Sequence, residues 1–297
     1  KNVRIGSGDS LDFASDFVSE NFIKGKGKSL TKFTPHRQTK LIESEEGNIQ
    51  PSSSGSLSGD FKLTPCDLVI MNPPFSDIEK IKKTSPDMLV KLKNNKILGN
   101  VCGNAVNLWG YFLVLANLAI TKTGRVAAVI PISIARGGAT QKIRDFMLEN
   151  FSTRFIIKPS NQDRAFSQNA NLKDILYVAD KRKPREDDKT AFVFFKTSVK
   201  KMEQGRASDI AKKLSEHYSI LNIGDVKQTE DYTIKIVSAT KLLDYSSNFM
   251  PLFVAPEIGE FVEQVREVGD PVFRNIVGND MRELYHGKTK KEGYTQL

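Results

Sequence analysis

Unbroken apolar runs alternate along the chain with segments whose apolar residues recur at helical spacing. The runs at 67–71 and 125–131 are rich in Val and Ile, and they predict strands buried on both faces, as in a parallel sheet. Further strands are expected at 2–7, 155–157, 174–179 and 192–195, and helices at 11–22, 104–120 and 141–150. This alternation predicts a doubly wound, mostly parallel α/β sheet of Rossmann-like type.

Two parts of the chain depart from this alternation. Residues 24–60 are rich in Lys, Gly and Ser, and a solvated, flexible insertion is expected there, although its basic glycines also suit a contact with phosphates. After residue 200 the periodicity weakens, with a helix expected at 208–218 and a strand at 232–237. The pattern therefore predicts a main domain over 1–200, and over 201–297 a linker and the start of a second, C-terminal domain.

Composition narrows the class of protein. Of the 297 residues 39% are hydrophobic, which is enough for a core, and no apolar run approaches the roughly 20 residues that span a bilayer. Two cysteines, Cys66 and Cys102, build no disulfide framework, and with three histidines no metal cluster is evident, so a reducing, cytoplasmic setting is expected. The formal net charge of +9 favours a polyanionic partner.

The strongest chemical signal is the tetrapeptide Asn72-Pro73-Pro74-Phe75, which follows the apolar run at 67–71. Two prolines cannot continue a strand, so the tetrapeptide is expected at the carboxyl end of that strand, where open α/β sheets place their ligands. The Asn72 side-chain oxygen and the Pro73 carbonyl suit acceptance of hydrogen bonds from one NH2 group, and the Phe75 ring suits stacking. The pattern indicates a planar substrate that carries an amino group; the alternative is an ordinary Pro-rich turn.

Lysines crowd the segment that follows this tetrapeptide, at positions Lys80, Lys82, Lys83, Lys91, Lys93 and Lys96. Beside a site for a planar amino compound they suit contacts with nucleic-acid phosphates. A solvated helix face explains the same residues equally well.

The tetrapeptide resembles the catalytic loop of amino-methyltransferases that use S-adenosylmethionine, above all the adenine-N6 DNA methyltransferases. The order of later segments adds to the likeness over residues 1–200, which looks like the modification subunits of type I restriction systems and related fused restriction-modification enzymes. The matching segments are Leu108–Ile120, Gly124–Pro131, Gln141–Asn150, Phe155–Ile157 and Ala165-Phe166-Ser167.

This resemblance implies a methyltransferase-type sheet and a methyl transfer from S-adenosylmethionine to adenine N6 in double-stranded DNA. It implies catalytic roles for Asn72, Pro73 and Phe75, and contact of Pro74 and Phe166 with the substrate base; the alternative for Phe166 is a plain core residue. Residues 201–297 would then lead into a DNA-recognition or accessory region. Specificity and restriction subunits become expected partners, and neither a metal nor a membrane is implied.

One departure from the family pattern concerns the cofactor. The Gly-rich cofactor loop that normally precedes the catalytic loop is absent, and Gly8-Asp9-Ser10-Leu11 fits a later family segment better. That segment would place Asp9 near the adenine ring of S-adenosylmethionine; a turn or N-cap role is the alternative. The chain is therefore expected to be a fragment that begins within the domain. An RNA guanine-N2 or protein-glutamine methyltransferase, and a non-catalytic DNA-binding or assembly fragment, remain as alternatives.

Overall fold

The computed structural model describes residues 30–33, 61–63, 65–76, 78–84, 86–94, 96–102, 107–160, 163, 166, 173–199, 202–246, 248–253, 261 and 264. The chain divides into two compact units, 1–253 and 254–297. The strand expected at 2–7, the helix expected at 11–22 and most of the insertion at 24–60 lie outside the described residues.

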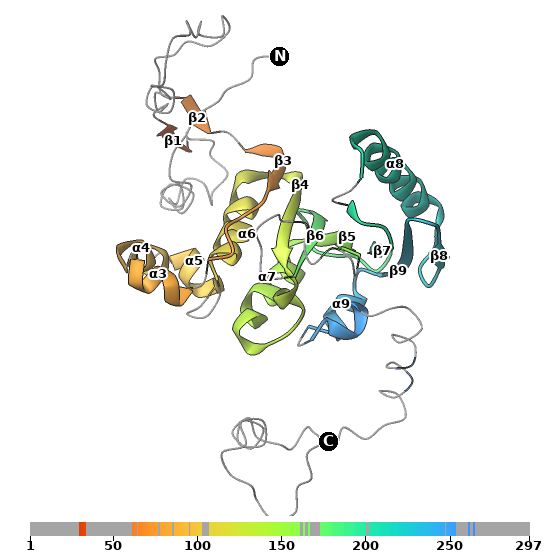
Figure 1. Cartoon of the computed structure of the whole chain (residues 1–297). Coiled ribbons are helices and arrows are strands. Elements are labelled where there is room, and N and C mark those ends of the chain that lie inside the picture. The colour runs from red at the N-terminus through yellow and green to blue at the C-terminus, as the bar shows by residue number, and fades with distance from the viewer. Residues whose placement is uncertain are drawn as a thin grey trace, which may run out of the picture. The chain divides into compact units, whose positions relative to one another are not determined.

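The first unit is built on a seven-stranded sheet with the order β3-β4-β6-β5-β7-β9-β8 (Figure 1). Its strands are β3 (Cys66–Met71), β4 (Ile120–Pro131), β5 (Ser152–Lys158), β6 (Asp174–Asp180), β7 (Lys189–Phe195), β8 (Val226–Gln228) and β9 (Tyr232–Ser238). β3 with β4, and β5 with β7, pair in parallel, whereas β6 and β9 run antiparallel to their neighbours. Five of the seven strands therefore share one direction, which confirms the expected mostly parallel α/β sheet.

The connections between these strands are largely helical. A separate antiparallel pair joins β1 (Leu30–Phe33) to β2 (Phe61–Leu63). The helices and 3-10 turns are α3 (Ile78–Thr84), α4 (Pro86–Asn94), α5 (Lys96–Cys102), α6 (Leu108–Ala119), η1 (Ile132–Ala135), η2 (Gly138–Thr140), α7 (Gln141–Asn150), α8 (Gln204–Ile220), α9 (Lys241–Asp244) and η4 (Met250–Phe253). The helix expected at 141–150 has those bounds, and the one expected at 104–120 is α6.

Burial of β3 differs from the expectation. The strand forms where predicted, but Leu68 and Ile70 are 51% and 76% exposed, so it is not buried on both faces. Among the strands that the structure describes, β3 is the first of the sheet and pairs only with β4, while Val69 and Met71 on its other face pack against the main core. An apolar run predicts burial, but how many layers cover the strand depends on the neighbouring elements. β4 likewise alternates between buried and half-buried positions.

Two clusters of apolar side chains cover opposite faces of the sheet. The larger one contains alternate residues of β4 and β6, such as Ala128 and Tyr177, together with most of α6 and the apolar residues of α7. On β7, Phe192 points into this cluster, while its neighbours Ala191 and Val193 lie in the second cluster with Ile210 of α8. Helices therefore cover both faces of the sheet, as a doubly wound fold requires.

The sheet continues past residue 200. β9 pairs with β7 along its whole length, and α8 packs on the face that these strands share. Lys189 of β7 donates from Nζ to the carbonyls of Tyr218 and Leu221 at 2.9 Å each, which caps the C-terminal end of α8 with a cation. The boundary expected at residue 200 therefore falls inside the first unit, and the chain divides after Phe253 instead.

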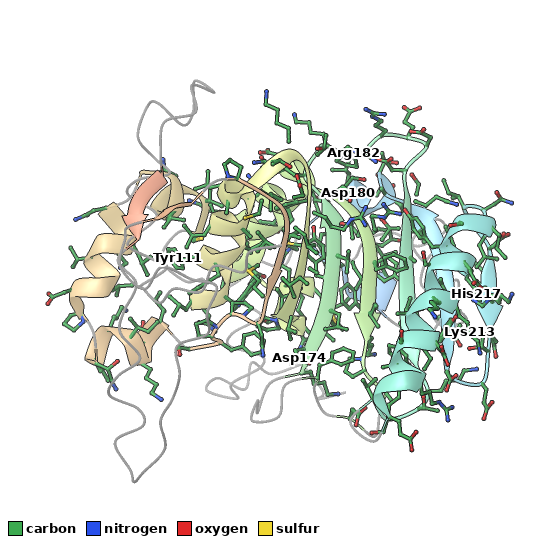
Figure 2. All side chains as sticks on the ribbon, turned by 90° about the horizontal axis from the view of Figure 1, so that it is seen from above. Tyr111, Asp174, Asp180, Arg182, Lys213 and His217 are labelled. Atoms are coloured by element: carbon green, nitrogen blue, oxygen red, sulfur yellow. The ribbon has the colours of Figure 1, made fainter. Side chains whose placement is uncertain are left out.

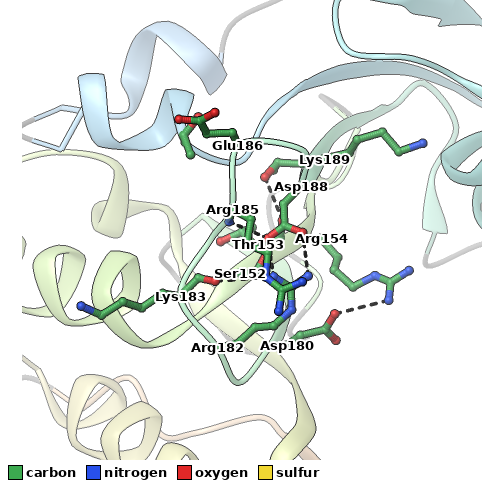
Figure 3. Close-up of polar contacts among 12 residues, drawn as sticks. Ser152, Thr153, Arg154, Asp180, Arg182, Lys183, Arg185, Glu186, Asp188 and Lys189 are labelled. Carbon is green, nitrogen blue, oxygen red and sulfur yellow. Dashed lines mark hydrogen bonds and ion pairs between the residues drawn. The ribbon is translucent and has the colours of Figure 1, made fainter.

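A network of charged and polar side chains connects the strands at the edge where β6 ends and β7 begins (Figure 3). The Asp188 carboxylate accepts two hydrogen bonds from the Arg182 guanidinium, one of them at 2.7 Å, and further bonds from Ser152 Oγ and Arg185 N at 2.8 Å each. Burial by itself raises the pKa of Asp188. The hydrogen bonds and the charge of Arg182 outweigh burial and hold that pKa at about 2.

The depressed pKa of Asp188 predicts a stability that depends on pH. The contribution of the Asp188 charge to the free energy of unfolding is fully present above the pKa that Asp has in the unfolded chain, about 3.9. It is lost as pH falls through the pKa of about 2 that Asp188 has in the folded protein. Asp188→Asn is expected to lower the free energy of unfolding at pH 7 by about 2 kcal/mol. Urea denaturation between pH 7 and pH 3 should show the gap to wild type closing below pH 4.

The neighbouring carboxylate provides a control for this measurement. Asp187 is exposed, so Asp187→Asn should leave the free energy of unfolding within about 0.5 kcal/mol of wild type at every pH. A gap for Asp188→Asn that stayed constant from pH 7 to pH 3 would contradict the role given to its charge.

Candidate active site

The carboxyl ends of four strands meet at one edge of the sheet. β3, β4, β5 and β7 run in the same direction, and the segments that leave them are 72–76, 132–140, 159–160 and 196–199. Figure 2 shows Asp174, the first residue of the antiparallel β6, at this edge, and Asp180 and Arg182 at the opposite one. Open α/β sheets bind their ligands outside the carboxyl ends of their strands, so this edge is the candidate site.

The Asn-Pro-Pro-Phe loop leaves β3 at this edge. Asn72 and Pro74 are exposed, Pro73 is buried, and Phe75 is partly buried against the main core. Beyond the loop, Leu108 N donates to Ser76 O at 3.3 Å, which ties it to the start of α6. A buried proline and a packed ring fix the backbone, so the loop presents the Asn72 side chain to solvent from a rigid support.

The register of β3 against β4 sets where this loop begins. Met71 lies opposite Ala128, three residues before the end of β4. At the other end of the pair, a Cβ added to Gly124 would stand 3.1 Å from the carbonyl oxygens of Cys66 and Asp67. Such a contact is tighter than most Cβ contacts, so a side chain at this position would require the β3 backbone to shift by a few tenths of an ångström, and Gly124 helps to hold β3 in place.

The segment after β4 is braced by a buried arginine. Arg144 of α7 is fully buried and donates to Ile134 O at 3.1 Å, Gly137 O at 2.9 Å and Thr140 Oγ1 at 2.6 Å. It also donates to Ser246 O at 2.9 Å. Burial lowers the pKa of the guanidinium, and the charge of Asp145 partly opposes this. Arg144 therefore joins the 132–140 segment to the end of the first unit.

Arg144 was not predicted from the sequence, although its position carried a signal. It lies three and four residues before Met147 and Leu148, which places its side chain on the apolar face of the helix. An arginine at such a position is buried only when several acceptors surround it.

Phe166 reaches the same edge from another segment. It is partly buried, and its backbone N donates to Asp174 Oδ1 at 2.6 Å. Asp174 is fully buried and lies opposite Pro131, the last residue of β4. The backbone of Phe166 is thus held at the same edge of the sheet from which the Asn72–Phe75 loop leaves β3.

Positive charge gathers at this edge. Lys158 ends β5, and its pKa is lowered by burial and by the neighbouring charge of Lys173. Its Nζ donates to Phe253 O at 3.3 Å. Arg136, in the segment after β4, and Lys173 are exposed. Cations near the ends of several strands suit contact with a polyanion.

Three other sequence expectations have different outcomes. Asp9, the expected cofactor contact, lies outside the described residues. Lys80, Lys82 and Lys83 are exposed on α3, and Lys93 on α4, so these lysines are available to solvent. Among the residues with a described placement, no group of three or more His, Cys, Asp or Glu side chains could hold a metal ion, and no helix is long and apolar enough to cross a bilayer.

The chain matches one protein family, and it is similar to solved structures of restriction-modification proteins. BpuSI, a type IIG restriction endonuclease, has a TM-score of 0.46 at 15% identity, covering 69% of this chain and 22% of that one. A protein of a type I restriction-modification system has a TM-score of 0.42 at 16% identity, covering 76% of this chain and 46% of that one. The methyltransferase subunit of a type I system from Streptococcus thermophilus has a TM-score of 0.41 at 17% identity, covering 63% of this chain and 37% of that one.

The chain therefore spans less than half the length of each of these three solved proteins. No curated protein matches it. The family described as Eco57I restriction-modification methylase matches residues 17–166, half of the chain, and the match includes both Asn72-Pro73-Pro74-Phe75 and Phe166. The chain belongs to the Eco57I restriction-modification methylase family.

Proposed function

We propose that this chain forms the catalytic part of a DNA methyltransferase of a restriction-modification system, which transfers a methyl group from S-adenosylmethionine to adenine N6. One observation carries the proposal: the Asn-Pro-Pro-Phe loop leaves the carboxyl end of β3, in a chain that belongs to a family of restriction-modification methylases. Loop and strand end together supply the hydrogen-bond acceptors and the ring that an aminopurine requires.

Asn72 and Pro73 act on the nucleophile. The lone pair of adenine N6 is delocalised into the ring, which makes this nitrogen a poor nucleophile. Hydrogen bonds from the N6 amino group to the Asn72 side-chain oxygen and the Pro73 carbonyl favour a tetrahedral nitrogen and offset the positive charge that develops on it. S-adenosylmethionine, when bound, supplies the electrophilic methyl group.

Phe75 and Phe166 act on the ring of the base. A base in duplex DNA must first leave the helix, at a cost of a few kcal/mol. Stacking on an aromatic side chain recovers roughly 1–3 kcal/mol, and Phe75 is the stacking partner in this proposal. Pro74 lines the same loop, and Phe166 contacts the base from a second segment of the edge.

The charge of the chain supports double-stranded DNA as the partner. The net charge of +9, the exposed lysines of α3 and the cations Arg136 and Lys173 at the candidate edge all suit phosphate contacts. Specificity and restriction subunits, and a DNA-recognition or accessory role for residues beyond the sheet, complete the proposal. A cytoplasmic location fits a chain with two cysteines and no disulfide framework.

The methylated product tests this proposal. The full-length protein that contains this chain is incubated with unmethylated plasmid DNA and S-adenosylmethionine, and the DNA is digested to nucleosides for mass spectrometry. N6-methyladenine is the expected product. N4-methylcytosine, or methyl groups found only on RNA or on protein glutamine, would contradict the substrate and leave the amino-methyltransferase loop in place. No methyl transfer to any of these acceptors would favour a non-catalytic, DNA-binding or assembly role.

A further inference from the structure

Asp174 is a buried carboxylate to which the mechanism above gives no role. It is 0% exposed, and its Oδ1 accepts the backbone N–H of Phe166 at 2.6 Å. Hydrogen bonds to an ionised acceptor are short and about twice as strong as neutral ones. Burying a carboxylate is costly unless hydrogen bonds compensate, so a bond at this place holds its donor firmly.

The position of Asp174 is tied to the catalytic loop through the sheet. Ile132 N, just past the end of β4, donates to Lys173 O at 2.9 Å, and Asp174 lies opposite Pro131. β4 in turn holds β3 in parallel register up to Met71, the residue before Asn72. Asp174 and the start of the Asn-Pro-Pro-Phe loop are therefore fixed to the same rigid strand.

A second buried carboxylate, Asp163, lies three residues before Phe166 and is also held by hydrogen bonds. Asp163 accepts Ser198 Oγ and Val199 N, at 2.6 Å each, from the segment that follows β7. Its own backbone N donates to Ser160 O at 3.1 Å. Asp163 thus fixes the chain ahead of Phe166 to one strand end, while Asp174 holds Phe166 itself at another.

We propose that Asp174 is a positioning residue, which sets the backbone of Phe166 so that its ring meets the extruded base; this rests on the proposed function. The carboxylate touches neither the base nor the methyl donor. Its effect is to fix the Phe166 ring before the base arrives, which removes the entropic cost of ordering that residue in the complex.

The hydrogen bond itself is tested without catalysis. The 297-residue chain is labelled with 15N-phenylalanine, and the Phe166 amide signal is identified by its loss in Phe166→Leu. Exchange of this amide with solvent should be slow in wild type and in Asp174→Asn, because an amide oxygen still accepts. In Asp174→Ala it should be about tenfold faster, since a bond worth roughly 1.4 kcal/mol changes the opening equilibrium tenfold. Equal exchange in all three proteins would overturn the proposal.

The consequence for the reaction is tested with the full-length protein, tritiated S-adenosylmethionine and plasmid DNA. Asp174→Ala should lower kcat/KM for DNA by about tenfold, within the roughly 5- to 150-fold range that the loss of one contact between an aromatic ring and a base gives. KM for S-adenosylmethionine should not change, and Asp174→Asn should keep activity within about threefold of wild type. If Asp174→Ala does not fold, Asp174→Leu replaces it, because leucine has the same branched shape as aspartate and carries no hydrogen-bond acceptor.

A double-mutant cycle separates positioning from general stabilisation. If Asp174 acts through Phe166, then Asp174→Ala adds less than about a twofold loss in a Phe166→Ala background. Asp188→Ala is the control, because it removes a half-buried carboxylate that also accepts a backbone N–H but lies at the opposite edge, and it should leave kcat/KM unchanged at temperatures where the protein is folded.

Losses that multiply in the double mutant, or an Asp188→Ala loss as large as that of Asp174→Ala, would show a merely structural role. A wild-type protein without methyl transfer would refute the proposed function, and with it the catalytic part of this inference. The amide exchange would still decide whether Asp174 holds Phe166, so the two failures remain distinguishable.

Discussion

Replacing Asn72 by alanine is expected to reduce methyl transfer by the full-length protein by about 100- to 1,000-fold, the usual loss when one group that stabilises transition-state charge is removed. The Asn72 side chain is exposed just after the end of β3, so the fold should not change. DNA affinity should stay within about threefold of wild type, because the acceptor acts mainly on the transition state. Single-turnover methylation with tritiated S-adenosylmethionine, alongside a DNA titration, measures both quantities.

Two variants sharpen this test. Asn72→Asp keeps side-chain oxygens as acceptors, so it should retain more activity than Asn72→Ala if hydrogen-bond acceptance is the role. Asn150 lies at the end of α7, just before β5 begins, and donates from Nδ2 to Phe146 O at 2.8 Å. Asn150→Ala removes an asparagine away from the candidate edge and should keep wild-type turnover. Wild-type turnover in Asn72→Ala would refute the catalytic assignment of the loop.

The second large effect concerns cofactor binding. Calorimetry on the 297-residue chain is expected to find S-adenosylmethionine bound more than roughly 100-fold more weakly than by the full-length protein. A Gly-rich loop of the family type is absent from this sequence, and the loss of three hydrogen bonds of about 1 kcal/mol each gives a factor of this size. A full-length protein titrated under the same conditions is the reference.

A dissociation constant in the micromolar range for the isolated chain would contradict this expectation. It would mean that the segment Gly6-Ser7-Gly8-Asp9 forms the cofactor loop after all. Gly8→Ala and Asp9→Ala would then separate the two readings: a backbone cradle requires the glycine, whereas a contact with the adenine amino group requires the carboxylate.

Much of the sheet follows from local patterns. The apolar runs at 125–131, 155–157, 174–179 and 192–195 each became a strand, and the helical spacing at 141–150 became α7 with the same bounds. These elements are buried on at least one face, and burial is what a run of Val, Ile, Leu and Phe reports. The Asn-Pro-Pro-Phe loop was predictable from another local signal, because two prolines cannot continue a strand and therefore mark its carboxyl end.

Other features depend on partners distant in sequence. Whether Leu68 and Ile70 are covered is decided by what packs on the outer face of β3, and the apolar run does not contain that information. The sheet passes residue 200 because β9 pairs with β7, a contact between segments separated by α8 and β8. The spacing of apolar residues identifies the buried face of a single helix or strand. Strand pairing, by contrast, depends on the residues of two strands together.

The amino-acid sequence determined many of the strands and helices between residues 67 and 195, the family and the loop on which the proposed chemistry rests, because each is encoded in residues adjacent along the chain. The tertiary structure alone decided that the buried acid beside Phe166 is Asp174 and that Arg144 braces the segment after β4. The sequence around Asp174 or Arg144 does not name the atoms that the side chain will bind. The role of each residue appears only when folding brings a backbone N–H or a set of carbonyls within about 3 Å of its side chain, since a buried charge is stable only where such partners converge.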